Sequence, residues 1–119
     1  MQQDLSARTG ARLVASDRVQ GTAVYNREGE RLGVIERVFI DKVSGQAEFA
    51  QMAFGGVMGI GHKHHPLPWA VLTFDPDKNG FVVDLDKKAL ADAPAYEEER
   101  LSGEDTAWVR EVTGHFGAS

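Results

Sequence analysis

Three histidines lie close together at His62, His64 and His65 and are the residues in this sequence best suited to ligate a metal ion. Imidazole nitrogens bind zinc, copper and nickel. In an extended segment His62 and His64 share a face while His65 points away. The only other histidine is His115, and no cysteine is present to serve as a ligand. A tetrahedral site needs four ligands. We therefore expect no metal site. If one exists, His62 and His64 are the residues expected to form it. The alternative function is a metal- or small-ligand-binding sensor that uses the loop from His62 to His65.

Nucleophiles and paired carboxylates show no arrangement that would support catalysis. Ser44 lies in a turn segment, while Ser16 and Ser102 occupy positions typical of backbone capping. Asp75 and Asp77 flank a proline, where aspartate is ordinary turn chemistry. Since no nucleophile is matched with a base, we expect a protein that is not an enzyme and that carries no cofactor.

The histidines belong to an unusual stretch, Gly55–Trp69, that contains four glycines and two prolines. The glycines permit positive φ, but the stretch runs into a proline-containing segment and not into a helix, so it does not match a phosphate-binding loop. Pro66 and Pro68 impose extended geometry on the approach to Trp69, which is predicted to close one end of a barrel.

Three apolar residues, Val57, Met58 and Ile60, lie among the glycines at the tip of this stretch. Apolar side chains on such a tip either fold over the core or contact another chain, and grouped exposed apolar surface marks interaction sites. They are predicted to form an interaction loop.

Composition limits the partners and the environment. With 119 residues the chain forms one domain, and its net charge is −5, of which residues 95–119 contribute −4. Without a basic stripe, direct binding of nucleic acid is not expected. The absence of cysteine suits a reducing compartment, and no apolar run approaches the roughly 18 residues of a membrane span. We therefore expect a cytoplasmic protein without a transmembrane segment.

The elements that would position these residues are short β-strands. Residues 1–15 are polar and predicted to be a flexible arm. Five runs rich in β-branched and aromatic residues, separated by turn signals, are predicted strands; they are Thr22–Tyr25, Arg31–Ile40, Gln46–Phe54, Trp69–Phe74 and Phe81–Leu85. The alternation in the second run predicts that its even-numbered side chains, from Leu32 to Ile40, form a face that is mainly core, while the opposite face, with Ile35 and Phe39, is mixed.

Residues 97–119 form an acidic tail that ends in a predicted amphipathic helix. Ser102 to Asp105 resembles a helix-start signature. Trp108, Val112 and Phe116 then recur every four residues and form one apolar stripe. Because a helix this short is marginal in isolation, the stripe is expected to dock on the barrel or on a partner, and we predict that it covers apolar outer surface of the sheet.

The order of these pieces resembles the PRC-barrel family, named for the photosynthetic reaction-centre H subunit and found also in a ribosome-maturation factor and in small stand-alone bacterial proteins. The resemblance covers residues 16–96. It is carried by Gly21-Thr22-x-Val24-Tyr25-Asn26, Gly29-Glu-x-Leu32-Gly33, Ile40-Asp41-x-x-x-Gly45, Phe54-Gly55-Gly56, Gly59-x-Gly61-x-Lys63, Pro66-x-Pro68-Trp69 and Phe81-Val-Val-Asp-Leu85. It implies an all-β fold, a small, strongly bent antiparallel barrel of about five to six strands, here with a C-terminal amphipathic helix.

The same resemblance implies an adaptor or assembly module without catalytic residues. We expect a non-enzymatic protein-interaction module that forms a homodimer through the apolar outer strand faces and the interaction loop, with a further protein partner that the sequence does not identify. An adaptor role in a ribosomal or membrane complex rests on the resemblance alone.

Overall fold

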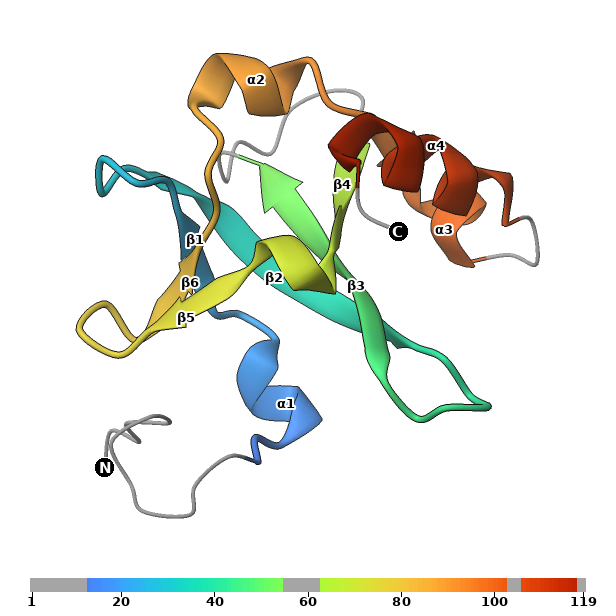
Figure 1. Cartoon of the computed structure of the whole chain (residues 1–119), viewed down its shortest axis with the longest axis horizontal. Helices are drawn as coiled ribbons and strands as arrows, with labels where there is room; N and C mark the ends of the chain where they lie inside the picture. Colours follow the sequence, from blue (N-terminus) through green and yellow to red (C-terminus); the bar gives the residue numbers. More distant parts are fainter. Residues whose placement is uncertain (1–12, 55–62, 103–105, 118–119) are drawn as a thin grey trace.

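The computed structural model describes residues 13–54, 63–102 and 106–117, which form one strongly curved sheet with short helices around it (Figure 1). In chain order the elements are α1 (Ser16–Val19), β1 (Ala23–Tyr25), β2 (Arg31–Ile40), β3 (Ala47–Phe54), β4 (Lys63–Pro68), the 3-10 helix η1 (Trp69–Val71), β5 (Thr73–Asp75), β6 (Gly80–Val82), α2 (Lys87–Ala91), β7 (Tyr96–Glu97), α3 (Glu98–Ser102) and α4 (Ala107–Phe116).

Among the described residues, seven strands form the sheet in the order β5-β6-β1-β2-β3-β4-β7. All neighbouring pairs are antiparallel except β1 and β6, which are parallel. The predicted all-β, barrel-like fold with a C-terminal helix is confirmed. It has more strands than the five to six expected, and β5 and β7 are the two edges of the sheet.

Two predicted elements differ from the observed ones. The run Trp69–Phe74 is not one strand, because the chain turns through η1, where the Leu72 amide donates to the Trp69 carbonyl, before β5 begins. Lys63–Pro68, which sequence reasoning left inside the central loop, is strand β4 and pairs with β3. The two prolines of this segment disfavour a strand, but proline is tolerated in a strand where the ladder needs no N–H donor at that position. The pairing with β3 could therefore not be predicted from composition.

Three β-bulges on β2 and β3 curve the central hairpin. The register shifts on β2 at Leu32, opposite β1, and at Glu36, opposite β3, and on β3 at Glu48. Each bulge adds a residue to one strand and breaks the alternation of its faces. As a result Leu32 and Ile35 both lie in the core, and Ile40 is 57% exposed. The prediction that the even-numbered face is mainly core was therefore wrong for Ile40, and Ile35, on the opposite face that was predicted to be mixed, is buried.

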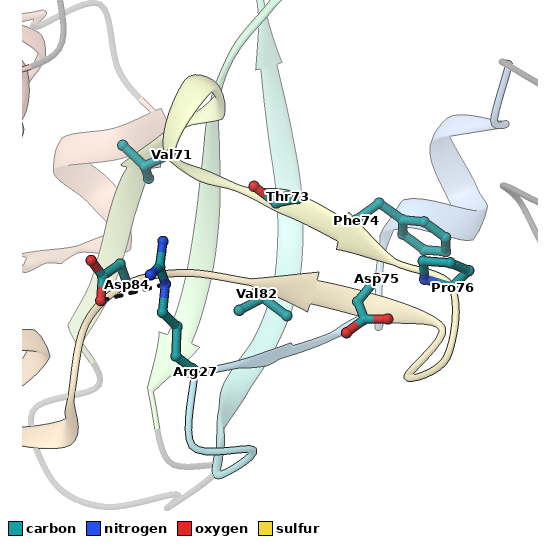
Figure 2. Close-up of a pocket in the computed structure, with 8 residues that line it drawn as sticks. All are labelled: Arg27, Val71, Thr73, Phe74, Asp75, Pro76, Val82 and Asp84. Carbon is teal, nitrogen blue, oxygen red and sulfur yellow. Dashed lines mark ion pairs between the residues drawn. The ribbon is translucent and has the colours of Figure 1, made fainter.

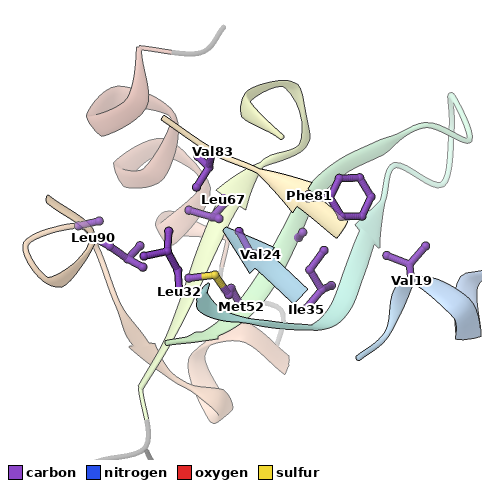
Figure 3. Packing of buried hydrophobic residues seen from close by; sticks show 11 residues of the cluster. Val19, Val24, Leu32, Ile35, Met52, Leu67, Phe81, Val83 and Leu90 are labelled. Carbon is purple, nitrogen blue, oxygen red and sulfur yellow. The ribbon is translucent and has the colours of Figure 1, made fainter. Parts of the chain in front are cut away.

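The main core fills the concave side of the sheet (Figure 3). It is made of aliphatic side chains, Phe81 and Met52, with contributions from β1, β2, β3, β4 and β6, from α1 through Val19 and from α2 through Leu90. The Asp86 side chain caps α2 by accepting a 2.7 Å hydrogen bond from the Ala89 amide. Among the described helices, none is long and apolar enough to cross a membrane.

Candidate interaction surfaces

A second apolar cluster lies on the convex side of the central hairpin. Trp108 of α4 packs against Phe39 of β2 and Phe49 of β3, with ring centroids 5.1 and 5.2 Å apart. Trp108 and Val112 are buried in this cluster, and Phe116 packs against both clusters. The predicted tail stripe thus packs through Trp108 on Phe39 and Phe49 of β2 and β3 within the same chain, and α4 lies beside β4 (Figure 1). The Phe39 and Phe49 rings are therefore covered by α4 of the same chain.

Tyr96 connects the sheet to the same helix. Its hydroxyl donates to the Glu111 carboxylate on α4, and the Arg100 guanidinium lies over its ring, 5.1 Å from the centroid. Burial, reinforced by the hydrogen bond and the negative charge of Glu111, raises the pKa of Tyr96 well above its usual value. The phenol therefore remains a donor at all physiological pH values. We call β7, α3 and α4 together the C-terminal extension.

A polar cluster lies next to α3. The bulge at Glu36 turns the consecutive β2 side chains of Glu36 and Arg37 toward the convex face. Glu36 Oε1 lies 2.5 Å from His64 Nδ1 and accepts a 2.9 Å hydrogen bond from Gln51 Nε2. Arg37 donates to Glu98 Oε2 over 2.7 Å, and His64 Nε2 lies 3.8 Å from Glu98 Oε1. His64 thus has a carboxylate facing each ring nitrogen. The cluster joins β2, β3 and β4 to α3.

The neighbouring histidine lies in a different environment. His65 is 5% exposed, stacks edge-on against Phe54 at 5.7 Å and forms a backbone hydrogen bond with Pro94, while its Nδ1 has no hydrogen-bond partner. Burial, with a smaller contribution from nearby His64, lowers the pKa of His65 despite the Pro94 bond. His65 is therefore the neutral, buried member of the pair.

The positions of the histidines bear on the metal-binding alternative. Both nitrogens of His64 face carboxylates of the cluster, and His62 lies outside the described residues. In the part of the chain that the structure describes, no three histidine, aspartate or glutamate side chains are grouped so that they could hold a metal ion.

The predicted anchor residues lie where β4 ends. Pro66 and Pro68 are buried and pair with Gln51 and Phe49 of β3. Trp69 opens η1 and packs edge-on against Phe81, with centroids 5.5 Å apart, at the margin of the main core. The predicted interaction loop, Val57, Met58 and Ile60, lies outside the described residues.

The tip of the β2–β3 hairpin exposes apolar side chains that sequence reasoning did not single out. Ile40 is 57% exposed and Val43 is 96% exposed. The turn itself is well formed, because Asp41 Oδ1 accepts hydrogen bonds from the Val43 and Ser44 amides, which lower the pKa of Asp41. Figure 1 shows this hairpin extending away from the helices. The available signal was a valine at the centre of a segment of turn-forming residues.

A pocket with a volume of about 360 Å³ lies on the outer side of β5 and β6 (Figure 2). It is lined by Arg27, Val71, Thr73, Phe74, Asp75, Pro76, Val82 and Asp84. Its only ion pair in Figure 2, Arg27 with Asp84, is loose at 3.7 Å and exposed. Ligand sites usually combine an apolar enclosure with a few convergent polar groups. This surface has no buried charged group directed into it among its lining residues.

Comparison with known families matches residues 12–90 to the PRC-barrel domain. The chain belongs to the PRC-barrel family. The predicted family is thereby confirmed. Among solved structures it is similar to a putative 16S ribosomal RNA processing protein RimM from Pseudomonas aeruginosa, at 18% identity and a TM-score of 0.41, over 63% of this chain and 45% of that chain. Comparison with curated proteins gives no match.

The family match ends at Leu90, before the C-terminal extension begins at Tyr96. Within the PRC barrel lie the hairpin tip, Glu36 and both buried histidines. The partners of these groups on the convex face, Glu98 and Trp108, come from the extension. The convex face of this PRC barrel is therefore completed by residues outside the matched segment.

Proposed function

We propose that this PRC-barrel protein is a non-enzymatic assembly module that self-associates as a dimer, with the β2–β3 hairpin tip as a principal contact. The observation that carries the proposal is the exposure of Val43 and Ile40 on a projecting, well-ordered turn. Neither side chain belongs to either hydrophobic cluster. Exposed apolar groups that do not serve the protein's own core are suited to burial against another chain.

A twofold-symmetric contact fits such a surface, because each copy would present the same hairpin to the other. We place the contact at the hairpin tip and not on the convex face at Phe39 and Phe49, which Trp108 covers. This differs from the expectation that the outer strand faces form the contact. The interaction loop at Val57, Met58 and Ile60 stays part of the proposed interface. We further propose that the module acts in the cytoplasm, in keeping with a sequence that lacks cysteine.

Light scattering coupled to gel filtration over a dilution series tests the proposal. Wild-type protein is expected to gain mass with concentration, and Val43→Lys is expected to stay monomeric. Ala91→Lys adds the same charge at an exposed position of α2 and should behave like the wild type. Wild-type protein that stays monomeric at the highest concentration would contradict self-association, and a Val43→Lys variant that dimerises would place the contact elsewhere.

A further inference from the structure

His64 lies between two carboxylates that belong to different parts of the molecule. Glu36 is on β2, within the barrel, and Glu98 is on α3, within the C-terminal extension. The two ring nitrogens lie 2.5 Å from Glu36 Oε1 and 3.8 Å from Glu98 Oε1. The His64 side chain is only 11% exposed, so water screens these interactions less than it would at the surface.

The proton on each nitrogen decides what the ring can do. A carboxylate only accepts hydrogen bonds, so Nδ1 must donate to Glu36. In the neutral ring the other nitrogen, Nε2, then carries a lone pair that faces the negatively charged Glu98. In the protonated ring Nε2 becomes a donor and the ring carries a positive charge. Protonation thus converts the contact between His64 and Glu98 from unfavourable to attractive.

The remaining neighbours hold this geometry in place. Gln51 Nε2 fixes Glu36 from β3, and Arg37 holds Glu98 at 2.7 Å whatever the state of the ring. The hydrogen bond from Tyr96 to Glu111 ties β7 to α4 nearby. One link in this set, that of His64 to Glu98, therefore depends on protonation, and the link through Arg37 does not.

Other charged groups around the ring act on it from each packed element. His65 follows on β4, and a positive charge there would oppose one on His64. Its own neutral form is the favoured one in the fold. Glu97 on β7 is exposed, and Arg100 on α3 lies over the Tyr96 ring. The groups that face the two ring nitrogens are the carboxylates of Glu36 and Glu98.

We propose that Glu36, His64 and Glu98 form a proton-dependent clamp that fastens the C-terminal extension to the barrel more tightly in mildly acidic than in alkaline conditions. Because α4 of the extension covers Phe39 and Phe49, the clamp controls how often this aromatic face opens to solvent or to another chain. The inference does not depend on self-association, since it concerns docking within one chain.

Hydrogen exchange of the α4 amides, measured by NMR at about pH 5.5 and about pH 7.5, tests the clamp in the window where imidazole changes its charge. Rates are divided by the intrinsic rate at each pH and compared with those of β3 amides, which report global unfolding. In the wild type, protection of α4 relative to β3 is expected to rise roughly two- to fivefold at the lower pH, as for a partly screened ion pair.

Two variants remove the clamp and one serves as the control. Glu98→Gln, at a half-exposed side chain, and His64→Gln are both expected to abolish the rise. Glu99→Gln removes an equal charge from the neighbouring exposed position on α3 and should leave the rise intact. A wild type without the rise, or a rise that survives in Glu98→Gln, overturns the proposal. If His64→Gln does not fold, Glu98→Gln alone decides the question.

Discussion

The indole ring of Trp108 meets the ring of Phe49 nearly edge-on, with centroids 5.2 Å apart and planes at 71°. Trp108 comes from the last helix and Phe49 from the central hairpin, so this contact closes the convex face of the sheet with a residue from outside the family match. Edge-to-face aromatic pairs contribute beyond the area they bury. Phe39 completes the site from β2 at 5.1 Å.

Truncation of this indole is expected to destabilise the protein strongly. Trp108 is 4% exposed, and replacing a buried tryptophan with alanine costs about 3–5 kcal/mol. Urea denaturation of Trp108→Ala should show this loss. Arg110→Ala, at an exposed position on the same helix, should change the free energy of unfolding by less than about 0.5 kcal/mol. A loss below about 1 kcal/mol for Trp108→Ala would mean that α4 contributes little to the fold.

Two glycines should respond in opposite ways to alanine. A Cβ on Gly33 would lie 2.0 Å from the Ala53 carbonyl oxygen across the β2–β3 ladder, so Gly33→Ala should cost at least about 2 kcal/mol. A Cβ on Gly114, within α4, would meet nothing within 4 Å. Gly114→Ala should therefore stabilise the protein by about 0.5–1 kcal/mol through helix propensity. Thermal unfolding of both variants checks the signs, and a stabilising Gly33→Ala would contradict the close approach.

The sequence was informative where local patterns decide the structure. The bounds predicted for Arg31–Ile40 are those of β2, and the four-residue spacing of Trp108, Val112 and Phe116 corresponds to α4. Turn chemistry and apolar periodicity are local properties that a single sequence carries. The predicted start of the tail helix was wrong, because Ser102 ends α3 and α4 begins at Ala107.

The bulges and the polar cluster could not be predicted in the same way. A bulge at Glu36 depends on the pairing register between β2 and β3, and no residue type at that position encodes it. The partners Glu36, His64 and Glu98 are separated by 28 residues or more in the chain, so only the folded sheet brings them together. Strict alternation consequently placed Glu36 on the core face and missed its contact with His64.

The turn between β1 and β2 depends on one buried amide. Asn26 is 1% exposed, and its side chain donates to Glu30 Oε1 and accepts from the Glu30 amide, both over 2.8 Å. Asn26→Ala leaves the Glu30 backbone amide without this acceptor and should lower the free energy of unfolding by about 1–3 kcal/mol. Glu30→Gln keeps a side-chain acceptor oxygen and the backbone N–H, so it should change the free energy of unfolding by about 0.5 kcal/mol or less. Equal losses in chemical denaturation would show that the Glu30 charge, and not the Asn26 amide, holds the turn.

The buried ring of His65 makes global stability fall in acid. Its pKa is lowered in the fold by burial, whereas in the unfolded chain a histidine titrates near about pH 6.5. As the pH falls from about 6.5 toward the lower folded pKa, the unfolded chain binds more protons than the native one, so stability decreases with at most about 1.4 kcal/mol per pH unit for this proton. Above about pH 6.5 the contribution is fully present. Urea midpoints measured across this range should fall less steeply in His65→Gln, which retains a donor for the Pro94 carbonyl, than in the wild type. Identical slopes in the two proteins would show that His65 does not titrate differently in the folded and unfolded states.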